Sequence, residues 1–369
     1  MSGSLYAETL LSPGLGVSFQ WRYQNDGGYL VDLLDPESPV CGALEHAIDR
    51  YENTVFALAP NKPNLIEWAN SQDTLQDPAD LHELRLGGAH VFQQAIELFQ
   101  TMQMMTDREE DPVRLSAIHH CIGDVMGFIG QRSGSSHFLE QAAMSYEQAL
   151  EIRSSEATPR EWAHTKLHLG IVMQCLGALE DDTRMLKEAL ETFKLAVNFL
   201  PRNEMPEAWA AAMGHVANVL CQLGTHRRGA RTLEQSVVAY SNALGVRRPE
   251  NNLHAWAITQ NNLAVAMQAH GVHEEDIGSL EACVPLYDTV LKVLDSQTLP
   301  MIWAMVAANR ASALLALAGE SDSLDMAETA ESEFRKIAAL FEGTKFSAYQ
   351  QAAGEQVREA QDLIRLLQV

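Results

Sequence analysis

The sequence predicts an all-α fold, a solenoid built from repeated pairs of helices, and two observations support this prediction. Tryptophan recurs at intervals of 47 residues, at Trp162, Trp209, Trp256 and Trp303. Small and aromatic residues recur around each of them at constant distances. A fixed period in this range is typical of stacked helical repeats that contact only their neighbours. We count positions in each repeat from this Trp position, which Leu115 occupies one period earlier.

Composition narrows the classes of partner. The 369 residues carry a formal net charge of −23, which argues against binding to nucleic acid or to an anionic membrane surface. The first 20 residues lack the features of a secretory signal, and the apolar stretches are interpreted as too short to cross a bilayer. Five scattered cysteines without paired spacing indicate reduced thiols. We therefore expect a cytoplasmic protein.

The first 60 residues predict a small β-hairpin followed by a capping helix. Val17–Tyr23 alternates apolar and polar residues, a turn follows at Asn25–Gly28, and Tyr29–Leu34 is β-prone again. Ala43–Leu58 has apolar residues at helical spacing. The hairpin is either a lid over the first repeat or an exposed edge that recruits a partner strand. We favour the lid, because exposed edges are usually covered.

Residues 61–106 predict a degenerate first repeat. Trp68 stands in register with the later tryptophans, but Ser71–Pro78 is polar and broken. Asp80–Met105 predicts a long helix. Terminal repeats are often irregular in this way, because one of their faces has no neighbour.

From Pro112 the repeats are regular, and each predicts a first helix, helix A. In four of the five repeats a proline stands three residues before the Trp position, where this helix is expected to begin. Eight residues after that position stand small residues, which let a second helix approach: Gly123, Gly170, Ala217, Ala264 and Ala311. Fifteen residues after it, small residues are expected to end helix A: Gly130, Gly177, Gly224, Gly271 and Ala318.

The second helix of each repeat, helix B, is predicted from an amphipathic stripe. Its aromatic positions are Tyr146, Phe193, Tyr240, Tyr287 and Phe334. Small residues four positions before the aromatics and apolar residues three positions after them complete a buried face. Residues 346–369 predict one more amphipathic helix, whose polar side caps the stack. The predicted domains are therefore 1–60, a solenoid over 61–345, and a terminal cap over 346–369.

The order of residues within a repeat resembles that of the tetratricopeptide repeat. Leu169-Gly170 lies in helix A, Ala189, Phe193 and Ala196 follow in helix B, and Pro201 comes after it. HEAT and armadillo repeats fit the period better, but the residue order favours the tetratricopeptide family with units lengthened by 13 residues. The resemblance implies a right-handed superhelix whose helices A face a concave groove that holds a peptide or a partner helix. The lysine that co-chaperone members of that family use to grip a C-terminal carboxylate is absent.

Carried over by position, the resemblance implies a groove lined largely by polar side chains. These are His120, Asp124, His164, His168, Gln174, His215, Asn218, Asn261, Asn262, Gln268, Asn309 and Ser312, with Cys121, Leu167, Ile171, Val265 and Met305 beside them. Polar groups are costly to bury without partners. Either they bond the backbone of a bound peptide, or they face water and form bonds between helices. The four Trp positions are expected to be buried structural anchors.

No cofactor or metal is expected. His164 and His168 could share an ion, but the histidines of successive repeats lie too far apart to converge on one. The sequence contains no catalytic motif that we identify. We therefore expect a non-enzymatic adaptor or assembly factor that binds a protein or peptide, and self-association is compatible with this. The alternatives are a ligand-responsive regulator and an enzyme.

Overall fold

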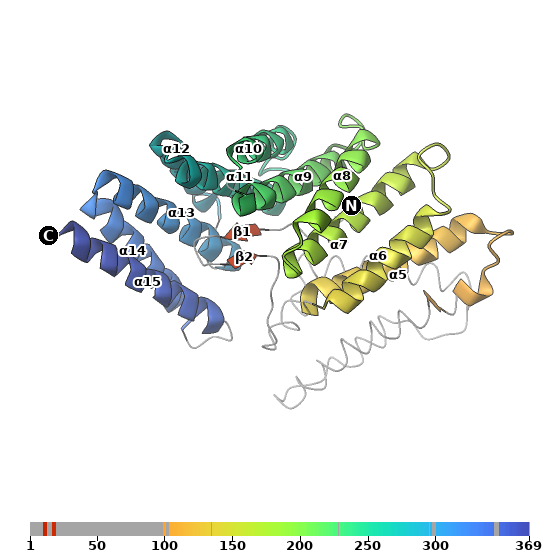
Figure 1. Ribbon diagram of the computed structural model, residues 1–369, viewed down its shortest axis with the longest axis horizontal. Coiled ribbons are helices and arrows are strands. Elements are labelled where there is room, and N and C mark those ends of the chain that lie inside the picture. The colour runs from red at the N-terminus through yellow and green to blue at the C-terminus, as the bar shows by residue number, and fades with distance from the viewer. Residues whose placement is uncertain are drawn as a thin grey trace, which may run out of the picture. The chain divides into compact units, whose positions relative to one another are not determined.

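The computed structural model describes residues 10–12, 17–19, 99–100, 103–133, 135–227, 229–294, 296, 300–342 and 347–368. The chain divides into two compact units, and along the helical part the boundary lies between Ile152 and Arg153. Residues 10–12 and 17–19 belong to the second unit. Figure 1 labels the helices and strands. The predicted capping helix at 43–58, and the predicted first repeat except for its last few residues, lie outside the described residues.

The described part of the first unit is a pair of antiparallel helices. Helix α5 is Pro112–Ser133 and helix α6 is Ser136–Leu150, and the two pack against each other along their length. Phe99 packs against Ile118 and Ile122 of α5.

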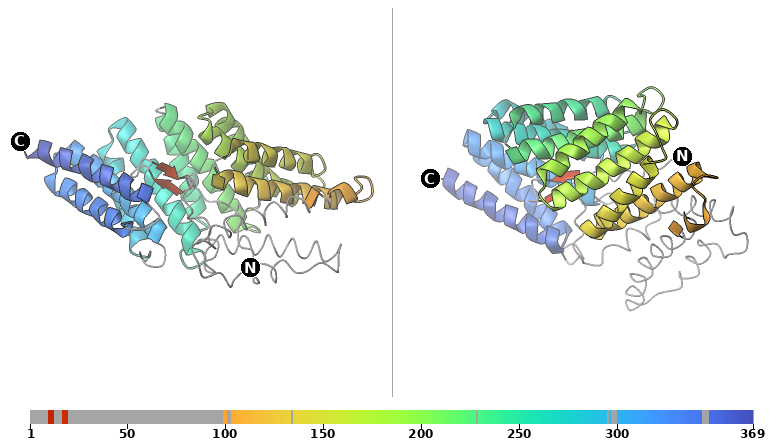
Figure 2. Two further views of the ribbon diagram at one scale, coloured as in Figure 1. Left: turned by 90° about the horizontal axis from the view of Figure 1, so that it is seen from below. Right: turned by 45° about the vertical axis from the view of Figure 1, so that its right-hand side comes forward.

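The second unit contains four further helix pairs and a last single helix. Its helices A are α7 (Pro159–Leu179), α9 (Pro206–Arg227), α11 (Leu253–Glu274) and α13 (Pro300–Ser321). Its helices B are α8 (Thr183–Asn198), α10 (Ala230–Leu244), α12 (Ile277–Leu291) and α14 (Leu324–Leu340), and α15 (Ser347–Leu367) follows. Each helix packs on the next, and successive helices A also contact one another, so the helices A form one layer (Figure 2).

The predicted register is confirmed in the described helices. Each helix A begins three residues before the Trp position, so the starts of α5, α7, α9, α11 and α13 are spaced by 47 residues. The starts of the paired helices B have the same spacing. An all-α, repeat-like arrangement is therefore established for the described residues.

The stripe of small residues in helix A explains this close packing. A Cβ atom added to Gly170 would lie 2.7 Å from Cε1 of Phe193, well inside van der Waals contact. Gly123 meets Tyr146 in the same way, at 2.6 Å. A side chain at this position would therefore push helix B away from helix A.

The expectation that the glycines at position fifteen end helix A is wrong. Helix α7 continues to Leu179, and a Cβ on Gly177 would lie 3.0 Å from the side chain of Leu186. This glycine instead permits the close approach of helix B. The chain turns later, at a residue with positive φ such as Asp181 (55°).

The tryptophans occupy equivalent places, in the first turn of each helix A, but they are less buried than expected. Only Trp256 is buried, at 8% exposure, and the other three are half-buried. The first turn lies at the end of the repeat, where a loop covers part of the indole. Trp162 meets Phe199 edge-on with ring centroids 5.0 Å apart, and the Arg202 guanidinium lies 4.8 Å from the Trp209 ring.

Two short strands accompany the second unit. β1 (Leu10–Ser12) pairs antiparallel with β2 (Val17–Phe19), with Leu10 opposite Phe19. β1 lies against α11 and α13. β2 coincides with the start of the predicted hairpin, but the turn and second strand of that hairpin lie outside the described residues, so the predicted pairing stays a prediction.

One helix contradicts the expectation about apolar length. Ile302–Ser321 is long and apolar enough to cross a membrane, with a mean hydropathy of 1.4 over its best window. About two thirds of that window (67%) is buried inside the fold, as in the core helix of a soluble protein. Packing against α12, α14 and α15 therefore accounts for its apolar character.

Helix α15 forms at the place where the terminal cap was predicted. It packs mainly on α14 and buries the small side chains Ala353 and Ala360. Gln361 Nε2 donates a hydrogen bond to Glu331 Oε1 of α14, at 2.9 Å. The predicted domain limits themselves stay predictions.

Candidate functional site

Four of the predicted groove residues bond to one another in a chain of amides that crosses three helices A. Asn262 Nδ2 donates to Asn218 Oδ1 at 3.1 Å, and Asn261 Nδ2 donates to Asn262 Oδ1 at 3.1 Å. Asn309 Nδ2 donates to Asn261 Oδ1 at 2.9 Å. The Tyr240 hydroxyl also donates to Asn218 Oδ1. We call Asn218, Asn262, Asn261 and Asn309 the amide chain; all four are buried.

Two further groups join predicted groove residues. Tyr287 donates to Gln268 Oε1 at 2.9 Å, and Gln268 Nε2 donates to Ser312 Oγ at 3.2 Å. His215 Nδ1 lies 3.4 Å from Gln174 Oε1. These contacts agree with the interpretation that the polar positions form bonds between helices. A role in holding a partner stays a prediction.

The remaining predicted residues lie on α7 and α5. His164 and His168 are half-buried on α7. In the first unit, His120 Nε2 lies 3.6 Å from Asp124 Oδ2, and Tyr146 donates to Asp124 Oδ1 at 2.8 Å. The apolar groove positions in the second unit are buried: Leu167, Ile171, Val265 and Met305.

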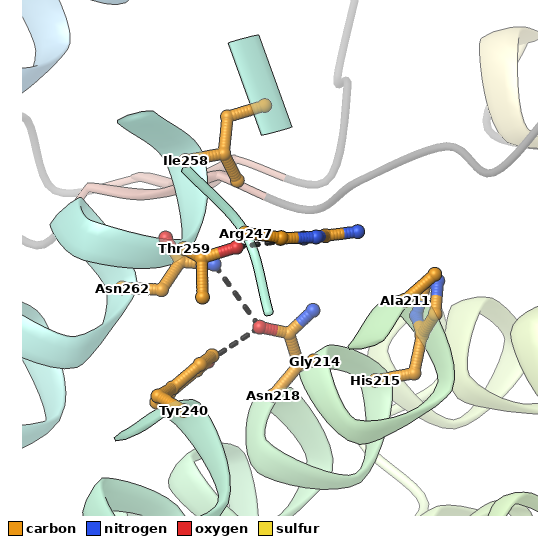
Figure 3. A pocket seen from close by; sticks show the side chains of 9 residues that line it. All are labelled: Ala211, Gly214, His215, Asn218, Tyr240, Arg247, Ile258, Thr259 and Asn262. Atoms are coloured by element: carbon orange, nitrogen blue, oxygen red, sulfur yellow. Dashed lines mark hydrogen bonds between the residues drawn. The ribbon is translucent and has the colours of Figure 1, made fainter. Parts of the chain in front are cut away.

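A polar hollow lies among α9, α10, α11 and the loop between the last two (Figure 3). Its ≈ 230 Å³ of empty space includes open solvent, and the enclosed part has room for about one water molecule. Three predicted groove residues line it, together with six residues that the sequence analysis did not select. The lining is Ala211, Gly214, His215, Asn218, Tyr240, Arg247, Ile258, Thr259 and Asn262.

His215 is the most unusual group of this hollow. It is 2% exposed, and its ring stacks on Phe193 with centroids 5.1 Å apart. Burial chiefly, together with the nearby Arg247 and His168, lowers its pKa from 6.5 to about 3, so the ring is neutral at pH 7. Its Nε2 is buried and has no hydrogen-bond partner among the described residues.

The side-chain amide of Asn218 uses its oxygen for bonds within the protein and turns its nitrogen towards the hollow. Its Oδ1 accepts both the Tyr240 hydroxyl and the Asn262 amide. Figure 3 shows the nitrogen on the side away from these two bonds. Because a carboxamide nitrogen carries two N–H groups, Asn218 presents a donor to this space.

Arg247 supplies a positive charge to the lining at 4% exposure. Its Nη1 donates to Thr259 Oγ1 at 2.6 Å and to the Ala255 carbonyl at 3.5 Å. Its Nε lies 3.9 Å from Glu207 Oε2. A Cβ on Gly214 would lie 3.9 Å from Arg247 Nη1, so the glycine leaves the space beside the guanidinium open.

A comparison of repeats two apart gives a signal for Arg247. Arg153 and Thr165 stand 94 residues before Arg247 and Thr259, which is two repeats. In the repeat between them the same two positions hold Leu200 and Ala212. The paired change of both positions indicates that the two side chains touch.

The hollow therefore combines donors and an acceptor without a nucleophile. The nearest buried thiol on α9, Cys221, has its pKa raised to about 12 by burial, and Cys283 on α12 is raised to the same value. Thiols of this kind are protonated at neutral pH and chemically inert. The arrangement can hold a water molecule.

Comparisons with known proteins assign neither a family nor a function to the chain. No family model matches the chain, and no curated protein matches it. The resemblance to tetratricopeptide repeats therefore rests on the residues quoted above, and the function has to be argued from the geometry of the second unit.

Proposed function

We propose that this protein is a non-enzymatic adaptor or assembly factor that binds an extended protein segment along the layer of helices A. In this proposal the repeats wind into a right-handed superhelix like that of tetratricopeptide repeats, and the layer of helices A is its binding face. The binding groups are side chains on α9, α11 and α13.

The observation that carries the proposal is the position of β1. This extended segment of the chain lies against α11 and α13, both of which are helices A. α11 also supplies Ile258, Thr259 and Asn262 to the polar hollow (Figure 3). A strand of the chain itself therefore lies on the face that we propose for a partner, against a helix that also lines the polar hollow.

The chemistry of this face suits a protein segment. The apolar positions on the helices A are buried in the chain as it stands, and the hollow offers hydrogen-bonding groups that fix orientation. Such a combination is typical of sites that select one ligand rather than bind through charge alone. The net charge of −23 favours a partner segment that is neutral or basic.

A peptide with the sequence of residues 8–22 is the sharpest probe, because it contains both strands. We expect it to bind in trans to a chain that lacks residues 1–22, with a Kd in the micromolar range that is common for short peptides. Fluorescence anisotropy of the labelled peptide measures this affinity. The full-length chain should bind it more weakly, because its own strand competes.

Two controls make the test specific. A scrambled peptide of the same composition should not bind. A peptide with Leu11→Pro should bind more weakly, since proline removes an N–H group and disfavours the extended pairing opposite Ser18. Equal binding of all three peptides, or no binding of any, would contradict the proposal.

A further inference from the structure

One histidine near the end of α11, His270, departs from the repeat. It stands fourteen residues after the Trp position, where the other repeats hold apolar residues, namely Ile129, Leu176, Leu223 and Leu317. The three leucines are buried. The His270 side chain is only 18% exposed, so a polar ring takes the place of an apolar side chain inside the array. Such a group needs polar partners to offset its loss of water.

The ring of His270 lies between two carboxylates that come from different elements. Its Nε2 is 3.8 Å from Glu234 Oε1 on α10, the second helix of the preceding repeat. Its Nδ1 is 4.0 Å from Asp276 Oδ2, in the turn before α12, and 3.3 Å from Ser279 Oγ on α12. Because α10 and α12 both pack on α11, each of the two neighbouring helices B brings a charged group to this ring.

The contact with Ser279 decides which nitrogen of the neutral ring carries the proton. The Ser279 hydroxyl donates to Asp276 Oδ2 at 2.6 Å, so it offers only a lone pair towards the ring. His270 Nδ1 therefore donates to Ser279 Oγ, which leaves the lone pair of the neutral ring on Nε2. This lone pair faces the Glu234 carboxylate, which can only accept, and no hydrogen bond then joins α10 to the ring.

A second proton on the ring changes this contact. We propose that His270 is a pH-sensitive clasp between the repeat of α9 and α10 and the repeat of α11 and α12. A proton taken up at Nε2 makes this atom a donor towards Glu234, while Nδ1 stays bonded to Ser279. The imidazolium then connects α10 to α12 across the end of α11. Histidine changes its charge between about pH 5 and pH 8, so the clasp closes in mildly acidic solution.

Both carboxylates suit this role. The Ser279 hydroxyl chiefly, with two backbone N–H groups and the neighbouring His270, lowers the pKa of Asp276, so this carboxylate stays ionised where a histidine titrates. The Glu234 side chain is 65% exposed and can turn towards the ring. Because exposed ion pairs contribute little to stability, the clasp adjusts the junction between the two repeats rather than holding it together.

The junction before this one carries a contact of the same kind. His226 Nε2, near the end of α9, lies 3.5 Å from Asp181 Oδ1 in the turn between α7 and α8. Here too the histidine stands near the end of a helix A and the carboxylate belongs to the preceding repeat. The turns on this edge are acidic at Asp181-Asp182 and Glu274–Asp276, which favours protonated rings beside them.

A double-mutant cycle on the full-length chain tests the clasp. The variants are His270→Leu, which introduces the residue that three other repeats hold, Glu234→Gln, and the two together. Urea denaturation is measured at about pH 5.5 and at about pH 8, on either side of the range in which histidine titrates. We expect a coupling of about threefold in the folding equilibrium constant at the lower pH, lost as the pH rises and the ring loses its second proton. The cycle cancels the titration of all other groups, His215 included.

A matched control is available two repeats later. Glu328 stands at the position of Glu234 on α14, and Glu328→Gln combined with His270→Leu should show no coupling at either pH. Coupling of equal size at both pH values between His270 and Glu234 would overturn the inference, because the contact would not depend on the proton. A lack of coupling at both pH values would overturn it as well. The inference does not rest on the proposed function, so the two tests are independent.

Discussion

Two arginine–threonine pairs of the second unit have nearly the same geometry but different surroundings. Arg153 Nη1 donates to Thr165 Oγ1 at 2.7 Å, and Arg247 Nη1 donates to Thr259 Oγ1 at 2.6 Å. Each arginine also lies 3.5 Å from the carbonyl oxygen four residues before its threonine. Arg153 is half-buried, whereas Arg247 is 4% exposed and lines the polar hollow.

The difference shows that the buried charge does not by itself mark a site. The pair braces the start of a helix A against the preceding loop in both places, so the repeat explains the arginine. The hollow is distinguished by His215, Asn218 and Gly214, which lie beside the second pair only. Function in a repeat protein therefore has to be sought in the departures from the repeat.

The largest expected effect on stability comes from replacing Arg247, with the same replacement at Arg153 as the comparison. Arg247→Ala should lower the free energy of unfolding by about 2–4 kcal/mol, because it leaves a cavity and removes bonds to Thr259 in a buried place. Arg153→Ala should cost only about 1 kcal/mol, since water can replace its bonds. Urea denaturation of both variants measures the difference. Equal losses would show that the two braces are equivalent.

The free energy of unfolding should also depend on pH through His215, which lies beside the Arg247 pair and not beside the Arg153 pair. The folded-state pKa of His215 is about 3, whereas the unfolded side chain titrates near 6.5. The stability contributed by the neutral ring is therefore fully present above pH 6.5 and is lost as the pH falls towards 3. The slope is at most about 1.4 kcal/mol per pH unit.

Unfolding free energies measured between pH 7 and pH 4.5 test this expectation. His215→Gln removes the titrating group and should flatten the curve. An unchanged slope in that variant would mean that other groups, chiefly carboxylates, determine the acid sensitivity.

Replacing Gly214, the glycine beside Arg247, should change stability less and should raise it. Gly214→Ala should raise stability by about 0.5–1 kcal/mol, because alanine favours the helix and its Cβ makes only an ordinary contact at 3.9 Å. Gly170→Ala is the matched control and should destabilise, because its Cβ would lie 2.7 Å from Phe193. Melting temperatures of the two variants should therefore move in opposite directions.

The smallest effect is expected when a whole pair is exchanged. Two other repeats hold Leu200 with Ala212 and Leu294 with Val306 at these positions, and all four side chains are buried. Replacing Arg247 and Thr259 by leucine and alanine should therefore change stability by less than about 1 kcal/mol. A larger loss would show that the charged pair is needed for folding at this place, and the same exchange at Arg153 and Thr165 is the control.

The repeat could be predicted because its information is local and occurs many times. Register, the glycine stripe opposite Phe193, and the terminal helix all follow from spacing in the sequence. The burial of the tryptophans was overestimated, since spacing does not say how completely a loop covers the end of a helix. The expectation that the apolar stretches are too short to cross a bilayer is wrong for Ile302–Ser321, because a helix buried inside a helical array is nearly as apolar as a spanning one.

The site was predicted less well, for a physical reason. Asn218 and His215 were selected as polar positions on helices A, but spacing cannot tell whether such groups bond to each other or to a ligand. Arg247 was missed because it lies in a loop, outside the helical pattern. Its pairing with Thr259 becomes visible in the sequence only when repeats are compared two apart.

The amide chain has a mechanical consequence. Because Asn218, Asn262, Asn261 and Asn309 connect α9, α11 and α13 through directional bonds in a buried place, relative rotation of these helices would break several bonds at once. This stretch should therefore behave as a stiff bar within the second unit. Bending of the array under load, or on capture of a partner, would then be concentrated at the joints that lack such cross-links.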